Sequence, residues 1–266
     1  MRYHVRIIHN PLRSVGYSRQ LGVRMARYSF IMFVDSDVIL TPNCISKLFH
    51  DLDRSGWAGI CASVLSLEND TYWQRAEDAK FRLNFNGTGR RSHIGMGATL
   101  FRKQVLLMHP FDANFAESSE DTDLFLRLSR AGLILGVSDA VIYHRHRRGF
   151  PEVGRRLFRF GLGDARLVLK YRSFRMLIRP LSGMLSYSIR CLLCGRLWLI
   201  PYWIVTSCCT FLGTMVGLRR YRRSVNESMP YHESLPMIRA TDPSSALAAK
   251  DNQQPVTFIT SGVTVQ

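Results

Sequence analysis

Two aspartates separated by a single serine, Asp35-Ser36-Asp37, stand near the end of the apolar run 28–40. Carboxylates this close repel each other unless a cation lies beside them. Hard divalent ions such as Mg²⁺ or Mn²⁺ prefer oxygen ligands of this kind and complete their coordination with phosphate oxygens and water. The pair therefore predicts a metal and phosphate site, although an isolated Asp-x-Asp is more often an acidic turn at a strand end.

The segments around this pair alternate between strand and helix patterns. The run 28–40 is continuously apolar and rich in strand formers, which is typical of a strand buried on both faces. Further strands are expected at 60–67 and 98–101, and helices at 18–27, 41–52 and 119–131. This alternation favours an α/β layer fold whose ligands bind at the carboxyl ends of the strands.

Four segments follow one another in a fixed order along the first 144 residues. They are Gly16-Tyr-Ser-Arg-Gln-Leu-Gly22, Phe33-Val-Asp-Ser-Asp37, Ser119-Glu-Asp-Thr-Asp-Leu-Phe-Leu-Arg127 and Val141-Ile-Tyr-His144. Together they resemble the family 2 glycosyltransferases, inverting enzymes with the Rossmann-like GT-A fold. Gln20 stands where that family usually has asparagine. The ordered combination is far more specific than any single motif.

The resemblance implies roles for the matching residues. Asp35 and Asp37, with Ser36 between them, would hold a divalent ion and the diphosphate of a nucleotide-sugar donor. Asp121, in the pair Glu120-Asp121, matches the catalytic base, which takes the proton of the acceptor hydroxyl. The remaining matches are Arg19 near the nucleotide, Gly97 and Ala98 beside the sugars, and His144 as a further metal ligand.

Simpler explanations exist for two of these roles. Acidic residues in the first turn of a helix are favoured by the helix dipole alone, which applies equally to Glu120 and Asp121. His144 adjoins the basic segment 145–148, which is typical of a solvated loop.

The N-terminal strand, loop and helix with which the family usually binds the nucleotide base have no counterpart in this sequence. Val5, Ile7 and Ile8 are typical of a strand whose earlier neighbours are missing. We therefore expect a truncated GT-A domain with an exposed sheet edge and an incomplete base pocket. The alternative to an active enzyme is an inactive fragment or pseudoenzyme that acts as a membrane-bound binding or scaffold protein.

Past His144 the chain becomes basic and then apolar. The segment 149–176 mixes arginines with leucine and phenylalanine, as in an amphipathic helix on a membrane surface or an ordinary solvated helix. Leu197 to Leu218 carries no charge and is long enough to span a bilayer, although a buried core helix is the alternative. The stretch from Leu177 to Cys194 is interrupted by Arg190 and is expected to be interfacial or a second span.

These patterns divide the chain into four regions. They are a GT-A-like catalytic domain (1–148), a basic interfacial segment (149–176), a membrane region (177–218) and a polar tail expected to be disordered (219–266). Arginines flank the membrane region on both sides. If positive charge marks the cytoplasm, a two-helix hairpin returns both flanks there. We expect a bacterial-type plasma membrane, with the catalytic domain facing the cytoplasm.

The whole chain is strongly basic, with 36 lysines and arginines against 20 acidic residues and a formal charge of +16. Such a surface attracts phosphates, anionic lipid or nucleic acid. The arginines crowd around apolar stretches instead of alternating with aromatic residues, so nucleic acid is not expected as a partner. The expected partners are a nucleotide-sugar donor, a saccharide or lipid-linked acceptor, and membrane lipid.

Overall fold

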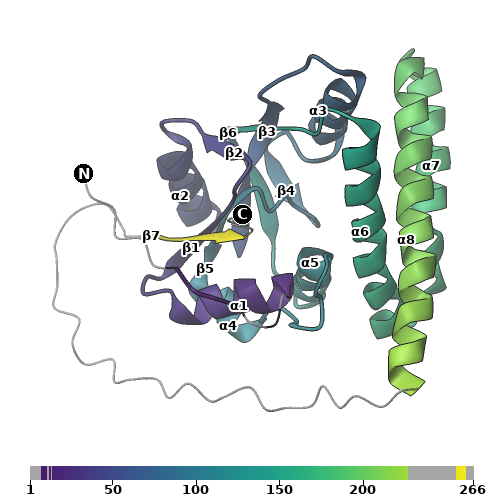
Figure 1. Ribbon diagram of the computed structural model, residues 1–266. Helices are drawn as coiled ribbons and strands as arrows, with labels where there is room; N and C mark the ends of the chain where they lie inside the picture. The colour runs from purple at the N-terminus through teal and green to yellow at the C-terminus, as the bar shows by residue number, and fades with distance from the viewer. Residues whose placement is uncertain (1–6, 11, 13, 227–255, 262–266) are drawn as a thin grey trace, which may run out of the picture.

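The computed structural model describes residues 7–10, 12, 14–226 and 256–261 (Figure 1). Within this part of the chain, seven strands form one mixed sheet in the order β2-β6-β3-β5-β1-β7, with β4 also beside β6. The strands are β1 Phe30–Asp35, β2 Val38–Leu40, β3 Gly59–Ser66, β4 Gly89–Arg91, β5 Ala98–Arg102, β6 Leu135–His144 and β7 Val256–Ser261. The strands expected at 60–67 and 98–101 are confirmed as β3 and β5.

Strand β1 is buried on both faces, as its continuous apolar sequence predicts. Ile31 and Phe33 belong to one core cluster, whereas Phe30 and Met32 belong to the cluster on the opposite face. The strand stops at Asp35, and the chain leaves the β1 position so that β2 pairs with β6 instead. Asp35 is therefore the last residue of β1, and Asp37 lies in the turn between β1 and β2.

Strands β1, β3, β6 and β7 run in the same direction. Both β1 and β3 pair antiparallel with β5. Strand β7 pairs parallel with β1, and β6 pairs parallel with β3. The carboxyl ends of β1 and β6 therefore reach the same edge of the sheet. This topology brings Asp35 and His144 to one end of the domain although they are far apart in sequence.

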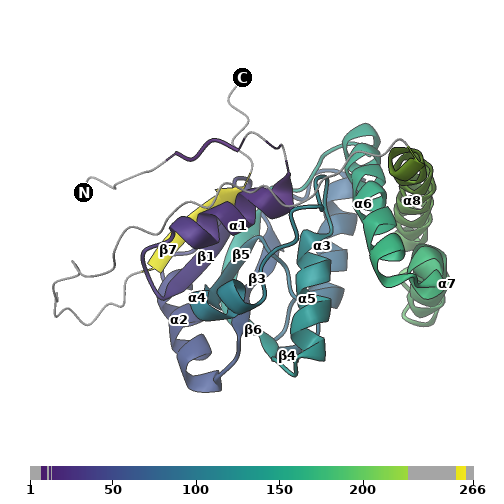
Figure 2. The same ribbon diagram turned by 90° about the horizontal axis from the view of Figure 1, so that it is seen from below.

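Helices cover both faces of the sheet (Figure 2). Those of the α/β domain are α1 Val15–Met25, α2 Cys44–Ser55, α3 Tyr72–Asn84, α4 Lys103–Met108 and α5 Glu120–Arg130. Side chains of α1, α4 and α5 pack into the cluster of Ile31 and Phe33, and those of α2 into the cluster of Phe30 and Met32. The helices expected at 18–27, 41–52 and 119–131 are confirmed as α1, α2 and α5.

Three long helices stand beside the α/β domain (Figure 1): α6 Phe150–Tyr171, α7 Phe174–Leu193 and α8 Ile200–Asn226, the last preceded by the short helix η1 Leu197–Leu199. The backbones of α6 and α8 touch. A Cβ atom on Gly161 would lie 2.1 Å from the carbonyl oxygen of Thr210, and one on Gly213 would lie 2.1 Å from that of Phe158. Small residues at such crossings allow helices to approach closely.

One helical stretch in the described residues, Leu197–Arg222, is long and apolar enough to cross a membrane. A third of the most apolar part of this helix is buried against the rest of the protein. Helix α7, which carries Arg175, Arg179 and Arg190, does not meet the same criteria of length and hydropathy.

The structure differs from the sequence-based expectation near both ends of the chain. Val256–Ser261, within the tail expected to be disordered, forms β7 and pairs in parallel with β1 from Phe30 to Asp35. The β1 edge, expected to be exposed, is therefore covered. Ile7, expected in a strand, lies outside any strand and is 91% exposed.

Local composition explains why Val256–Ser261 forms a strand. Val256-Thr-Phe-Ile-Thr-Ser261 consists mainly of β-branched and aromatic residues, which favour strands, although polar sequence precedes it. Helix α8 also continues to Asn226, past the predicted end of the membrane region at 218. The rest of the predicted tail, 227–255 and 262–266, lies outside the described residues.

Candidate active site

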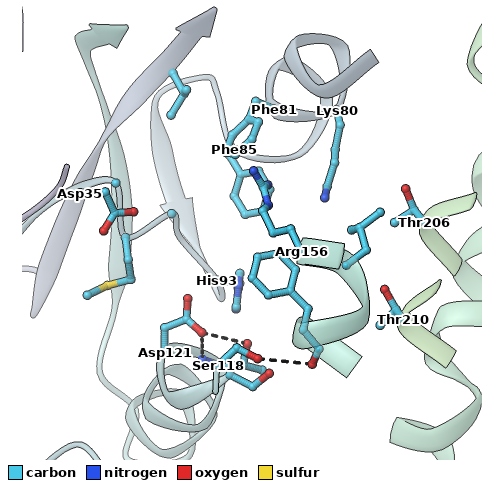
Figure 3. Close-up of a pocket in the computed structure, with 18 of the residues that line it drawn as sticks. Asp35, Lys80, Phe81, Phe85, His93, Ser118, Asp121, Arg156, Thr206 and Thr210 are labelled. Carbon is cyan, nitrogen blue, oxygen red and sulfur yellow. Dashed lines mark hydrogen bonds between the residues drawn. The ribbon is translucent and has the colours of Figure 1, made fainter. Parts of the chain in front are cut away.

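A cavity of about 730 Å³ opens at the carboxyl end of β1 and continues past α3 to the three long helices (Figure 3). The structure places all of the predicted site residues on its wall: Arg19, Asp35, Ser36, Asp37, Gly97, Ala98, Glu120, Asp121 and His144. They come from α1, the β1–β2 turn, the start of β5, the first turn of α5 and the end of β6. Their meeting follows from the shared direction of β1 and β6 and from the position of α5.

The two aspartates of the β1–β2 turn face this cavity with part of each side chain exposed. The side chain of Asp35 is 33% exposed and that of Asp37 is 25% exposed. The amide of Asp35 donates to the carbonyl of Gly97 at 2.9 Å, which fixes the turn against the start of β5. Both carboxylates can therefore reach a ligand without a rearrangement of the backbone.

Basic side chains surround the two carboxylates. A guanidinium nitrogen of Arg19 lies 3.8 Å from Asp35, and one of Arg147 lies 3.4 Å from Asp37. The Nε2 atom of His144 lies 3.5 Å from the Oδ1 atom of Asp37. The two arginines offset the repulsion between the aspartates and also provide positive charge for a phosphate.

The carboxylate oxygens of Asp35 and Asp37 suit a divalent ion that also binds a phosphate. Among the described residues, no group of three or more acidic, histidine or cysteine side chains is arranged to hold a metal unaided. Mg²⁺ and Mn²⁺ are commonly bound through one or two carboxylates, with phosphate oxygens and water as the other ligands. Asp35 and Asp37, partly exposed on one wall, meet that requirement.

Arg19 and Glu120 form a buried ion pair behind the aspartates. Glu120 is 3% exposed and Arg19 6%, and one Arg19 nitrogen donates to Glu120. Burial raises the pKa of Glu120 to about 7; Arg19 lowers it, and Asp121 raises it further. Because Glu120 is engaged by Arg19, it is better placed to orient Arg19 than to accept a proton from a substrate.

Asp121 lies in the first turn of α5 and on the cavity wall. The amide of Thr122 donates to its Oδ1 atom at 2.6 Å, which fixes the orientation of the carboxylate. The residue before the helix, Ser119, has φ +69° and donates through its hydroxyl to Asp164 of α6 at 2.9 Å. The start of α5 is thereby tied to the long helices.

The cavity also contains ionisable residues that sequence reasoning missed. His93 lines it near Asp121; burial lowers the pKa of His93, and the Asp121 carboxylate opposes that shift. Lys80 of α3 and Arg156 of α6 line the far end (Figure 3). Burial first, and then the charge of Arg156, lowers the pKa of Lys80 to about 8. These are isolated residues without a spacing signal, so the sequence offered no means of finding them.

A mixed α/β domain whose cavity joins two strand-end aspartates to a third carboxylate has the organisation of a group-transfer enzyme acting on a phosphate-bearing substrate. The model of the glycosyl transferase family group 2 matches residues 30–219, and the chain belongs to that family. The protein is therefore a glycosyltransferase. Membership implies a nucleotide-sugar donor and a saccharide acceptor.

The crystal structure of TarS residues 1–349 from S. aureus is 12% identical, with coverage of 82% of this chain and 73% of that one. Its TM-score of 0.39 is too low to establish a shared fold. No curated protein sequence matches the chain.

Proposed function

We propose that the protein is a membrane-associated, inverting glycosyltransferase in which Asp121 is the catalytic base and Asp35 and Asp37 bind the donor diphosphate together with Mg²⁺ or Mn²⁺. The observation that carries the proposal is that these three carboxylates, from the β1–β2 turn and from α5, line one cavity. The cavity is large enough for a nucleotide sugar and part of an acceptor.

The proposed reaction is a single displacement. The acceptor hydroxyl loses its proton to Asp121, and its oxygen forms a bond to the anomeric carbon of the donor sugar. The bond from that carbon to the diphosphate breaks, and the nucleoside diphosphate leaves with the bonding electrons. Arg19 and Arg147, beside the two aspartates, offset the negative charge that develops there. Asp35 and Asp37 would hold the divalent ion, which would supply further positive charge beside the leaving diphosphate.

Features of the long helices support the membrane part of the proposal. Large apolar side chains on α7 are exposed at spacings of three and four residues, which defines one face of the helix. They are Phe174, Ile178, Leu181, Leu185, Ile189 and Leu192. This set is the apolar stripe of α7. Together with the apolar stretch Leu197–Arg222, it favours contact with lipid, with the arginine-flanked ends and the catalytic domain on the cytoplasmic side.

The test is a donor-hydrolysis screen of the full chain in detergent across nucleotide sugars with Mn²⁺. Asp121→Asn is expected to lower kcat by about a hundredfold to ten-thousandfold while nucleotide binding persists. Asp37→Ala is expected to abolish metal-dependent binding of the nucleoside diphosphate. Asp139→Asn, which alters an exposed carboxylate paired with Lys47, is the control.

Equal turnover by wild type and Asp121→Asn would remove Asp121 as the base. Donor binding without any turnover, with Asp121 and Asp37 intact, would favour the alternative of a binding or scaffold protein.

A further inference from the structure

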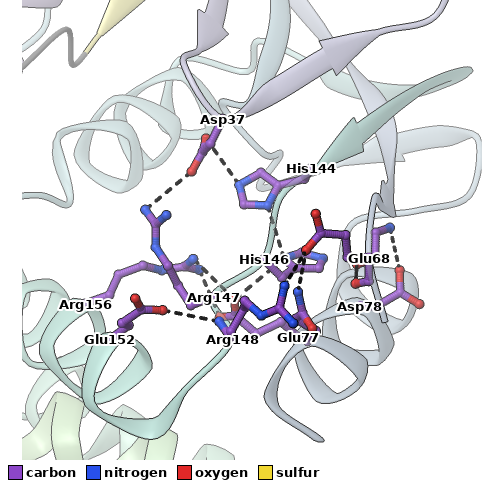
Figure 4. Close-up of polar contacts among 12 residues, drawn as sticks. Asp37, Glu68, Glu77, Asp78, His144, His146, Arg147, Arg148, Glu152 and Arg156 are labelled. Atoms are coloured by element: carbon purple, nitrogen blue, oxygen red, sulfur yellow. Dashed lines mark hydrogen bonds and ion pairs between the residues drawn. The ribbon is translucent and has the colours of Figure 1, made fainter. Parts of the chain in front are cut away.

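Polar contacts hold helix α6 against the α/β domain, and some of them reach the start of α5, the helix that carries Asp121. Near the N-terminal end of α6, Arg156 lies 3.2 Å from an oxygen of Glu77 of α3 (Figure 4). The hydroxyl of Tyr202 of α8 donates to the same oxygen at 3.5 Å. Because Glu77 is fully buried, these contacts fix α6 against α3.

Two serines that precede α5, Ser118 and Ser119, contact α6 further along. The hydroxyl of Ser118 donates to the carbonyl of Arg159 at 3.1 Å. The hydroxyl of Ser119 donates to the Oδ1 atom of Asp164 at 2.9 Å, and both residues are buried. A Cβ atom on Gly163 would lie 2.4 Å from the carbonyl oxygen of Ser118, so the two backbones nearly touch. Helix α6 therefore contacts the start of α5 directly.

Ser119 has an unfavourable backbone conformation. Its φ of +69° lies in the left-handed region, which costs free energy for residues other than glycine. A serine before a helix usually accepts a hydrogen bond from an amide of the first turn, but the Ser119 side chain makes no such bond in α5. Its hydroxyl donates to Asp164 instead. Such a conformation persists only where the surrounding structure holds it, and the contact with α6 provides that hold.

The carboxylate of Asp164 is itself fixed, because both of its oxygens have partners. Its Oδ1 atom accepts from Ser119, and its Oδ2 atom accepts from a guanidinium nitrogen of Arg179 of α7 at 3.2 Å. Burial raises the pKa of Asp164, and the charge of Arg179 opposes that shift. Asp164 lies on the cavity wall, but its engaged oxygens suit it to hold other side chains and not to bind a substrate.

The position of Ser119 determines where the Asp121 carboxylate lies. The carbonyl of Ser119 accepts from the amide of Asp123 at 3.0 Å, which joins Ser119 to the first turn of α5. Within that turn, the amide of Thr122 fixes the carboxylate of Asp121. A displacement of Ser119 would therefore displace Asp121 as well. A general base must lie within hydrogen-bond reach of the proton that it removes, so even a small displacement lowers the rate.

We propose that Asp164 is a positioning residue, which holds the start of α5 through the Ser119 hydroxyl and so directs the Asp121 carboxylate toward the acceptor. This inference rests on the proposed function, in which Asp121 is the base. Arg179 extends the contact to α7. The position of the base thereby depends on two of the long helices.

The first experiment measures how firmly α6 holds the start of α5. In hydrogen-exchange measurements on the full chain in detergent, Asp164→Ala is expected to speed amide exchange over residues 120–123 by about tenfold, as for the loss of one buried hydrogen bond. The control Ser138→Ala removes another buried serine–aspartate bond, from Ser138 of β6 to Asp51 of α2, and should leave these amides unchanged. Unchanged exchange in Asp164→Ala would overturn the proposal.

The second experiment uses Ser119→Gly, which serves for the exchange measurement too if Asp164→Ala fails to fold. Glycine adopts a φ of +69° readily, so the variant loses the hydroxyl without added strain, and its melting temperature should stay close to that of wild type. In the donor-hydrolysis assay with Mn²⁺, kcat is expected to fall by about tenfold to a hundredfold. The affinity for a nucleoside diphosphate should not change, because Asp35 and Asp37 are untouched. Ser138→Ala should keep both values, and a wild-type kcat in Ser119→Gly would overturn the positioning role.

An Asp121→Asn background shows whether the effect passes through Asp121. Adding Asp164→Ala to Asp121→Asn is expected to cause little further loss of kcat, because the carboxylate to be positioned is already absent. A further loss as large as that of Asp164→Ala alone would mean that Asp164 acts independently of Asp121, and would refute the positioning role. Full activity of Asp121→Asn itself would instead refute the proposed function, while the exchange experiment would still decide whether α6 holds the start of α5.

Discussion

At the scale of single residues, Glu120 is a buried carboxylate on the cavity wall, and burial changes its response to pH. Burial raises the pKa of Glu120 to about 7, against an ordinary value of 4.5. Between these two values the folded protein holds a proton that the unfolded chain has released, so the stability of the fold decreases as the pH rises through this window. The contribution is complete below pH 4.5 and lost above about pH 7.

Replacement of Glu120 by glutamine is expected to remove this dependence. The melting temperature of wild type, relative to that of Glu120→Gln, should fall as the pH increases from 4.5 to 7 in calorimetric scans of the full chain. Glu117→Gln is a suitable comparison, since Glu117 on the same cavity wall is exposed and pairs with Arg159 at the surface. A wild-type curve parallel to that of Glu120→Gln would show that Glu120 is ionised throughout the window.

What the sequence revealed about the site depended on order and spacing. Asp35, Asp37 and Asp121 were found because they occur in segments with a recognisable sequence, and the structure brings these segments to one cavity. Glu77 and His93 had no such signal. Glu77 lies in a helix that the sequence pattern did not reveal, and its partners Arg156 and Tyr202 are about eighty and more residues away.

At the scale of elements, β7 is the least expected part of the fold and covers the outer edge of β1. Removal of residues 256–266 should expose that edge, and amide exchange over Phe30–Asp35 should become faster in hydrogen-exchange measurements. Removal of residues 262–266 alone keeps the strand and is the control. Equal exchange in both truncated proteins would mean that β7 does not protect β1.

Local pattern accounts for the elements that were predicted and for those that were not. Strand β1 was evident because burial on both faces requires a continuous apolar run. Helix α3 buries polar residues, Gln74, Glu77 and Asp78, beside Ala76, so its sequence lacks the apolar periodicity that predicts a helix. The composition of β7 favours a strand but does not show which strand it pairs with. Its pairing with β1 joins residues far apart in the sequence, and no local pattern encodes such a pairing.

At the scale of the whole molecule, the long helices carry both the apolar stripe of α7 and much of the arginine excess behind the net charge of +16. The long helices meet α3 through an apolar cluster that includes Ala76, Leu157 and Tyr202. Polar contacts are added at Glu77 and by the hydroxyl of Tyr187, which donates to Asn84 at 2.7 Å.

The membrane proposal gives the last prediction. The full chain, transferred from detergent to phosphatidylcholine vesicles containing phosphatidylglycerol, should co-sediment with them. Leu185→Glu with Ile189→Glu, which places two charges in the apolar stripe, should weaken binding by about tenfold or more, because each buried side chain of this size contributes about 1.5–3 kcal/mol. Leu107→Glu with Met108→Glu makes the same change at two exposed apolar residues of α4 and should have a much smaller effect. Equal losses from the two pairs would show that added negative charge alone reduces binding, and that α7 is not the surface that contacts lipid.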